Sequence, residues 1–258
     1  MIRYKKSLGQ NFLIDKNILS KITEKINIKN QNIFEIGAGS GNLTEYILSK
    51  NPTSLTIIEK DQNLYNNLLE KFNHHENIKI INGDILKFDL EKKIKSNSII
   101  FGNLPYNIST KIHTSLIKFK SWPPKYKNLV LMFQKEVADR IISDSGSSSY
   151  GRLSILTGAR LKLIESFFVS KNCFYPKPKV DSKVLFFQPL HKNYVEFKNL
   201  QKLEKITNLL FTNRRKMINK VFRKKFKKPE ELMKKLNLKP SNRPEEIKKE
   251  IFYELIKN

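Results

Sequence analysis

Short runs of β-branched and aromatic residues alternate with helix-like segments through the first two thirds of the chain. Residues 32–36 and 54–59 have the composition of strands, and between them Leu43, Ile47 and Leu48 mark one face of a helix, which makes one βαβ unit. The same alternation predicts helices at 62–72 and 109–119, and strands at 78–81, 98–101, 128–133, 165–169 and 183–187. Repeated βα units predict an α/β fold with a doubly wound, mostly parallel sheet, and we expect the last two strands to form an antiparallel pair at one edge.

The pattern changes after Pro189, where strand-like runs end and helical spacing takes over. Apolar residues then recur every three or four positions, as through 203–210. Residues 214–228 are rich in Lys and Arg but keep apolar positions, which predicts an amphipathic basic helix. We therefore expect two domains, residues 1–189 and a small basic helical domain at 190–258.

The chain is strongly basic throughout. Its 258 residues hold 49 Lys and Arg against 24 Asp and Glu, a formal net charge of +25. Such an excess predicts a polyanionic partner, and nucleic acid is favoured over an acidic membrane surface. Residues 191–258 hold 20 of the basic and 8 of the acidic residues, so both expected domains are basic. A coding bias toward Lys, Ile and Asn is the alternative explanation for part of this charge.

The composition offers little for metal or disulfide chemistry. There is one cysteine, Cys173, and there are four scattered histidines. The basic N-terminus is not followed by an apolar signal segment, and no run approaches the roughly 18–20 apolar residues that a membrane span requires. We expect a soluble protein of the reducing cytoplasm that uses no metal.

Glycines and acids stand at the ends of the first three strands of the expected sheet. Residues 35–41, Glu-Ile-Gly-Ala-Gly-Ser-Gly, form a turn whose glycines let the backbone approach a ligand, although a plain tight turn explains the same spacing. Glu59 ends the second strand, where a carboxylate can accept hydrogen bonds from both hydroxyls of a ribose. Asp84, followed by Ile85, closes the third, where a side chain can meet an adenine amino group. Three such strand ends favour one nucleoside pocket.

The fourth strand ends in Asn103-Leu104-Pro105-Tyr106. The exocyclic amino group of adenine is a poor nucleophile, because its lone pair is delocalised into the ring. The side-chain oxygen of Asn103 and the carbonyl oxygen of Leu104 are able to accept its two hydrogens and so aim the lone pair at an electrophile, while Tyr106 is able to stack on the base. A proline turn capped by Asn103 is the structural alternative.

Further motifs accompany these segments in a fixed order along most of the chain. The motifs are Lys6–Leu13 (KSLGQNFL), the loop at 35–41, Asn103–Ser109 (NLPYNIS), Gln134–Arg140 (QKEVADR), Tyr150–Ser154 (YGRLS), Phe174–Ser182 (FYPKPKVDS) and Asn213–Lys216 (NRRK). The combination resembles the KsgA/RsmA family of rRNA adenine dimethyltransferases.

This resemblance implies a Rossmann-like class I methyltransferase sheet, S-adenosylmethionine as the methyl donor, and no metal. The acceptors that it implies are two adjacent adenosines in the 3′-terminal hairpin loop of 16S rRNA, in the small ribosomal subunit or its precursor. Each would be methylated twice to give N6,N6-dimethyladenosine. The resemblance also implies a role in small-subunit biogenesis for a monomer that does not bind membranes.

The resemblance also implies site residues. The N-terminal arm is expected to fold back over the donor pocket, and Phe174 is expected to stack on the flipped adenine opposite Tyr106, with anchoring of the loop as the alternative role of Phe174. One departure is Ala38, where the family usually has proline. The expected donor-binding residues are Asn11, Leu13, Gly37, Gly39, Glu59, Asp84, Ile85 and Asn103, the catalytic residues are Asn103, Leu104, Pro105 and Tyr106, and the RNA-binding residues are Phe174, Arg214, Arg215 and Lys216.

Several alternatives stay open. Arg140 and Arg152 suit either phosphate contacts or structural ion pairs, and residues 214–216 suit either an RNA-docking surface or a solvated face. The 23S rRNA adenine methyltransferases of the macrolide-resistance type share the implied fold and an Asn-x-Pro-Tyr motif, but Leu104, residues 150–152 and residues 214–216 favour the small-subunit enzyme. A non-catalytic assembly factor is the second rival, and the intact donor pocket argues against it.

Overall fold

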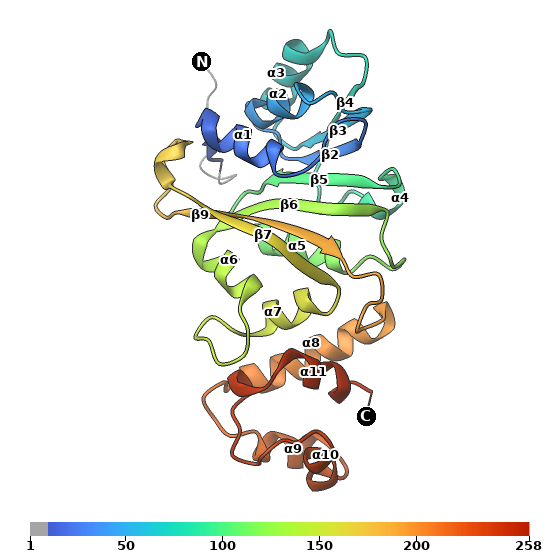
Figure 1. Ribbon diagram of the computed structural model, residues 1–258, viewed down its shortest axis with the longest axis vertical. Helices are drawn as coiled ribbons and strands as arrows, with labels where there is room; N and C mark the ends of the chain where they lie inside the picture. Colours follow the sequence, from blue (N-terminus) through green and yellow to red (C-terminus); the bar gives the residue numbers. More distant parts are fainter. Residues whose placement is uncertain (1–9, 258) are drawn as a thin grey trace. The chain divides into compact units, whose positions relative to one another are not determined.

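The computed structural model describes residues 10–257 (Figure 1). Contacts between Cα atoms divide the chain into two compact units. Of the described residues, the first unit holds 10–116, 123–138 and 163–189, and the second holds 117–122, 139–162 and 190–257. The C-terminal segment thus groups with two earlier segments, and the predicted domains at 1–189 and 190–258 stay a prediction.

A seven-stranded sheet forms the core of the first unit (Figure 1). Apart from residues 161 and 162, the whole sheet belongs to this unit. Its order is β4-β3-β2-β5-β6-β9-β7. Neighbours from β4 to β6 are parallel, and β9 runs antiparallel to β6. The strands are β2 (Asn32–Ile36), β3 (Ser54–Glu59), β4 (Ile78–Asn82), β5 (Ser98–Asn103), β6 (Tyr126–Gln134), β7 (Leu161–Val169) and β9 (Ser182–Pro189). The structure confirms the predicted α/β class, the mostly parallel sheet and the antiparallel strand toward its edge.

The strand order creates a natural site for a ligand. From β2 the chain adds β3 and β4 on one side and then returns to place β5 on the other side. Helices that follow β2 and β5 therefore leave in opposite directions, and the carboxyl ends of these two strands flank the crevice in which such folds bind ligands.

Helices cover both faces of the sheet. On one face, side chains of α1 (Lys16–Glu24), α2 (Asn42–Leu48) and α3 (Gln62–Phe72) share a buried apolar cluster with β2, β3 and β5. Aspartates begin two of these helices, because Asp15 accepts a hydrogen bond from the Ile18 amide at 3.0 Å and Asp61 accepts one from the Asn63 amide at 2.9 Å. The other helices that begin in this unit are α4 (Leu90–Lys93), α5 (Ser109–Ile117) and α6 (Lys135–Ile142).

On the other face, α5 packs through a buried histidine. The His113 ring lies 5.5 Å from the ring centroids of both Phe133 on β6 and Phe187 on β9. Complete burial lowers the pKa of His113 to about 3, so the imidazole is neutral in the folded protein.

A second, two-stranded sheet joins the N-terminal arm to the loop before β9. β1 (Phe12–Leu13) pairs antiparallel with β8 (Phe174–Tyr175), with Leu13 opposite Phe174. The short 3-10 helix η2 (Lys171–Cys173) precedes β8, and the Cys173 carbonyl accepts a hydrogen bond from the Ile14 amide at 2.9 Å. This pairing was not predicted, because strands of two residues have no alternation to detect.

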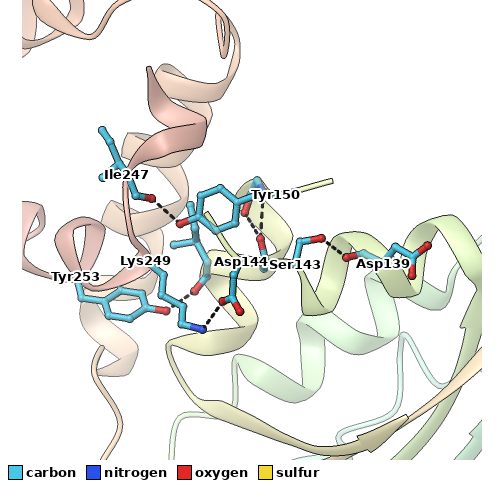
Figure 2. A network of polar contacts seen from close by, with 10 residues as sticks. Asp139, Ser143, Asp144, Tyr150, Ile247, Lys249 and Tyr253 are labelled. Carbon is cyan, nitrogen blue, oxygen red and sulfur yellow. Dashed lines mark hydrogen bonds and ion pairs between the residues drawn. The ribbon is translucent and has the colours of Figure 1, made fainter. Parts of the chain in front are cut away.

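The second unit is helical. Buried tyrosines connect its early and late segments (Figure 2): the Tyr150 hydroxyl donates to the Ile247 carbonyl at 2.9 Å, and the Tyr253 hydroxyl donates to the Ile155 carbonyl at 2.9 Å. Its helices are α7 (Arg152–Gly158), α8 (Phe197–Phe211), α9 (Asn219–Lys225), α10 (Pro229–Lys235), the 3-10 turn η3 (Pro244–Glu246) and α11 (Lys249–Leu255).

A buried arginine connects another early segment to this unit. Arg160 is fully buried, and its Nη1 donates to the carbonyls of Ile117 and Phe119 at 3.0 and 2.6 Å. Its Nε donates to the Val195 carbonyl at 3.1 Å. These bonds explain why residues 117–122 belong to the unit formed by the C-terminal helices.

The basic helix predicted over 214–228 is present only as α9 (Asn219–Lys225), so the prediction was wrong for the residues before and after α9. α8 ends at Phe211 and α9 begins at Asn219, so Arg214, Arg215 and Lys216 lie in the turn between the two helices. Tertiary hydrogen bonds hold this turn out of helical geometry, since the Ile218 amide donates to the Asn242 carbonyl at 2.9 Å.

Within residues 10–257, none of the helices combines the length and the apolar composition that a membrane crossing requires.

Candidate functional site

A cavity lies at the carboxyl edge of the sheet, where β2, β3, β4 and β5 end. Its lining includes every residue that was predicted to bind the donor or to be catalytic: Asn11, Leu13, Gly37, Gly39, Glu59, Asp84, Ile85, Asn103, Leu104, Pro105 and Tyr106. The structure therefore brings this set together, and the roles of its members stay predictions. The part of the first motif at residues 6–9 lies outside the described residues.

The loop after β2 uses left-handed backbone conformations that favour glycine. Gly37 and Gly39 have φ values of +70° and +59°. A Cβ atom on Gly39 would lie 2.9 Å from the ring of Phe12, whereas one on Gly37 would meet no atom within 4 Å. Gly39 thus lets the N-terminal arm pack against the loop, and Gly37 leaves open space beside the cavity.

The carboxylate of Glu59 is held by main-chain amides. Its Oε2 accepts a hydrogen bond from the Gly39 amide at 3.0 Å, and its Oε1 accepts one from the Asp61 amide at 2.9 Å. Burial raises the pKa of Glu59, and these hydrogen bonds oppose that shift. The Lys60 amide is a third backbone donor to this carboxylate. A carboxylate has about four acceptor positions, so Glu59 is still able to accept a hydrogen bond from a hydroxyl group of a ligand.

Asp84 lies in a different electrostatic environment. Its Oδ2 pairs with the Lys60 ammonium at 3.0 Å, and its Oδ1 accepts a hydrogen bond from the Leu86 amide at 2.9 Å. The hydrogen bond from Lys60 is the main reason that the pKa of Asp84 lies below its usual value. Asp84 is therefore an anionic acceptor at neutral pH, and Lys60 joins the cavity lining without having been predicted.

The Asn103 amide is oriented by the N-terminal arm. Its Nδ2 donates a hydrogen bond of 3.0 Å to the main-chain carbonyl of Asn11. Because the nitrogen is committed in this way, Oδ1 is the atom left to accept a hydrogen bond from a ligand.

Tyr106 lines the cavity and is half-buried. A hydrogen bond of 2.7 Å joins its hydroxyl to that of Ser182, and its carbonyl accepts a hydrogen bond of 3.1 Å from the Ser109 hydroxyl. Burial raises the pKa of Tyr106, so the phenol is neutral at physiological pH.

Sequence reasoning also missed a buried acid of the cavity, Glu35. Its side chain is buried beside the loop and accepts a hydrogen bond from the Thr44 hydroxyl at 2.7 Å. Burial raises the pKa of Glu35 to about 7, and the nearby Glu59 contributes to this rise. The sequence places Glu35 at the start of the glycine loop, but burial of its carboxylate is visible only in the structure.

Phe174 lies outside the cavity lining. It is 3% exposed, packs in the apolar cluster of the first unit and pairs with Leu13 across the small sheet. This geometry supports the anchoring role of Phe174. Stacking on a target base stays a prediction, and it would require Phe174 to become accessible.

The predicted RNA-binding cations differ in their environments. Arg214 is held inside its unit, because its Nε pairs with Glu245 at 2.8 Å and its Nη1 donates to the Ser148 carbonyl at 2.8 Å. Arg215 and Lys216 are exposed. The exposed positions suit a contact with phosphate, whereas Arg214 has a structural role that the sequence did not reveal.

Comparison with known proteins gives matches over the whole chain. The family model for ribosomal RNA adenine dimethylase matches residues 1–258. The Ribosomal RNA small subunit methyltransferase A of Pelagibacter ubique (strain HTCC1062) is 45% identical over 257 residues, which cover 99% of this chain and 97% of that protein. The protein of the same name from Neorickettsia sennetsu (strain ATCC VR-367 / Miyayama) is 40% identical over 232 residues, 89% of this chain and 87% of that protein.

Two solved structures share the fold. A dimethyladenosine transferase from Plasmodium falciparum superposes with a TM-score of 0.81 at 25% identity over 95% of both chains. The 23S rRNA methyltransferase ErmE superposes with a TM-score of 0.70 at 22% identity, over 95% of this chain and 98% of that one. The second likeness is one of fold alone.

Proposed function

Because the chain belongs to the ribosomal RNA adenine dimethylase family, we propose that it methylates two adjacent adenosines in the 3′-terminal hairpin loop of 16S rRNA. S-adenosylmethionine is the proposed donor, and N6,N6-dimethyladenosine is the proposed product. The choice of the small subunit is supported by relatives at 40–45% identity that are named small-subunit methyltransferases. We expect the protein to act as a cytoplasmic monomer during small-subunit biogenesis.

The cavity has groups that suit each part of this donor. Glu59 offers a carboxylate acceptor to the ribose hydroxyls, and Asp84 offers an anionic acceptor to the adenine amino group. The space beside Gly37, which a Cβ atom would enter, suits the methionine part. When bound, the donor supplies an electrophilic methyl group.

The observation that carries the proposal is the orientation of Asn103. With Nδ2 bonded to the Asn11 carbonyl, Oδ1 is available to accept one hydrogen of the target amino group. The carbonyl of Leu104 is the proposed acceptor for the other hydrogen. Two acceptors that hold both hydrogens favour a tetrahedral nitrogen, whose lone pair is then no longer delocalised into the ring.

Binding of the target requires an adenine that is flipped out of the RNA stack and contacts between the protein and the RNA phosphates. Tyr106 borders the cavity with a neutral ring, which suits stacking on a flipped adenine. The exposed cations of the second unit, Arg215 and Lys216 among them, suit contacts with phosphates. Sequence choice would then depend on the shape of the RNA loop.

The test uses small ribosomal subunits isolated from cells that do not methylate this loop. Incubation with the purified protein and labelled S-adenosylmethionine is expected to place two methyl groups on each of two adjacent adenosines. Dimethylated adenine cannot form a Watson–Crick pair, so reverse transcription should stop at this loop. Reverse-transcription stops in large-subunit rRNA would instead support a 23S rRNA methyltransferase. Binding to the small subunit without any methyl transfer would support a non-catalytic assembly factor.

A further inference from the structure

The Tyr106 side chain is fixed at its far end by a residue from another motif. Its hydroxyl forms a 2.7 Å hydrogen bond with the hydroxyl of Ser182, the last residue of the Phe174–Ser182 motif. Its main chain is fixed separately, through the 3.1 Å hydrogen bond from Ser109 to the Tyr106 carbonyl. The residue is therefore held at its main chain and at the far end of its side chain, although the ring borders an open cavity.

Ser182 itself occupies a rigid position. It is the first residue of β9, lies opposite Gln134 in the register with β6, and is fully buried. The residue before it is tied in two directions, because the Asp181 carbonyl accepts a hydrogen bond from the Lys135 amide and its carboxylate accepts one from the Lys171 amide, both at 2.9 Å. Ser182 cannot move far without breaking these bonds.

The bond matters because the hydroxyl lies at the far end of the side chain, so a partner that holds it fixes the direction in which the ring points. A ring that stacks on an extruded base must stay at one position beside the cavity, and ordering it only when the base arrives would cost conformational entropy. A hydrogen bond with a fixed, buried serine holds the ring at that position before RNA binds. It also satisfies the phenol oxygen, which would otherwise be partly desolvated.

We propose that Ser182 is a positioning residue for the target adenine, and that it acts by holding the Tyr106 ring at the position where it stacks on the base. This proposal rests on the proposed function, in which Tyr106 stacks on the base. The proposal assigns a role to the last residue of the Phe174–Ser182 motif. The motif begins in β8, which pairs with β1 of the N-terminal arm, and ends at the serine that bonds to Tyr106.

The experiment is a double-mutant cycle with Ser182→Ala, Tyr106→Phe and the double variant. Each is assayed for methyl transfer to unmethylated small subunits and for affinity for S-adenosylmethionine. Either single change should lower kcat/KM for the subunits about three- to tenfold, the usual range for losing one hydrogen bond, with donor affinity unchanged. The double variant should be no worse than Tyr106→Phe alone. Ser98→Ala is the matched control, because Ser98 is also buried and begins β5, at the end of that strand away from the cavity.

If the wild-type protein methylates small subunits normally, either of two outcomes would overturn the proposal. One is wild-type kinetics in Tyr106→Phe. This variant removes the hydrogen bond and leaves the buried Ser182 unchanged, so it tests the proposal even if Ser182→Ala does not fold. The other is an additive loss in the double variant, which would mean that Ser182 acts independently of Tyr106. A wild-type protein that does not methylate small subunits would instead refute the proposed function.

Discussion

The side-chain nitrogen of Asn103 donates a 3.0 Å hydrogen bond to the main-chain carbonyl of Asn11, 92 residues earlier in the chain. The orientation of the Asn103 amide therefore depends on the backbone of the N-terminal arm. The arm is fixed in turn by the pairing of β1 with β8 and by the hydrogen bond from Asn42 Nδ2 to the Leu13 carbonyl at 2.8 Å. A loop at the end of β5 and an arm before β2 thus form one site.

Replacing Asn103 tests its proposed role directly. Asn103→Ala removes the acceptor for the target amino group and should reduce transfer about a hundredfold or more, because the nucleophile loses its alignment. Binding of small subunits should stay nearly unchanged, since phosphate contacts supply most of that affinity. Transfer is followed with labelled donor and binding by sedimentation. Thr110→Ala, an exposed change on the next helix, is the control, and an equal loss of RNA binding in Asn103→Ala would contradict the assigned role.

Glu59→Gln should weaken donor binding. The carboxylate accepts hydrogen bonds from the Gly39 and Asp61 amides, and a carboxamide would place an NH2 group against one of them. We expect affinity for S-adenosylmethionine to fall about ten- to a hundredfold, the range for hydrogen bonds to a charged group. Isothermal titration calorimetry measures this affinity. Glu70→Gln removes an exposed carboxylate from α3 and should bind the donor normally, and unchanged affinity in Glu59→Gln would place the ribose elsewhere.

The buried carboxyl of Glu35 predicts a dependence of stability on pH. Its pKa is raised from 4.5 to about 7, so the folded protein holds this proton after the unfolded chain has released it. The free energy of unfolding should therefore fall as pH rises from 4.5 to 7, by up to about 3 kcal/mol from this group. Glu35→Gln removes the effect. Burial lowers the pKa of His113 from 6.5 to about 3, so this group makes the free energy of unfolding fall as pH decreases below 6.5. The contribution of His113 is the same in both proteins and cancels in the difference between Glu35→Gln and wild type.

The measurement is urea unfolding of wild type and Glu35→Gln at pH 5 and pH 7.5. The variant should gain stability relative to wild type at the higher pH, because only wild type then has an ionised carboxylate buried beside Glu59. Glu76→Gln, an exposed change, should show no such difference. A constant offset between Glu35→Gln and wild type at both pH values would mean that the Glu35 carboxyl does not hold its proton.

Local sequence signals predicted the parts of this fold that depend on local chemistry. The helix expected at 62–72 is α3, since Asp61 caps its start and apolar residues recur on its buried face. Acids and glycines at strand ends also led to the cavity, because parallel topology brings carboxyl ends to one edge whatever the loops do. Glu59 and Asp84 meet there for this reason.

The features that sequence reasoning missed depend on contacts between distant segments. The pairing of Leu13 with Phe174 buries an aromatic ring that was expected to be available for stacking. The turn at Arg214 replaces the expected start of a helix, because Glu245 and the Ser148 carbonyl hold its guanidinium. No periodicity within a segment carries information about such partners.

The different environments of Arg214 and Arg215 lead to separable effects. Arg215 and Lys216 are exposed, so Arg215→Ala combined with Lys216→Ala should lower RNA affinity and reduce the slope of log affinity against log salt by about one for each phosphate that these cations neutralise. Arg214→Ala removes the bonds to Glu245 and Ser148 and should instead lower stability by about 1 kcal/mol, a modest value because the ion pair is partly exposed. Filter binding to small subunits across a salt series measures the first effect and thermal unfolding the second. Lys202→Ala combined with Lys205→Ala removes the same charge from exposed positions on α8, and an equal change of slope in that control would mean that diffuse charge, and not the turn at 214–216, attracts the RNA.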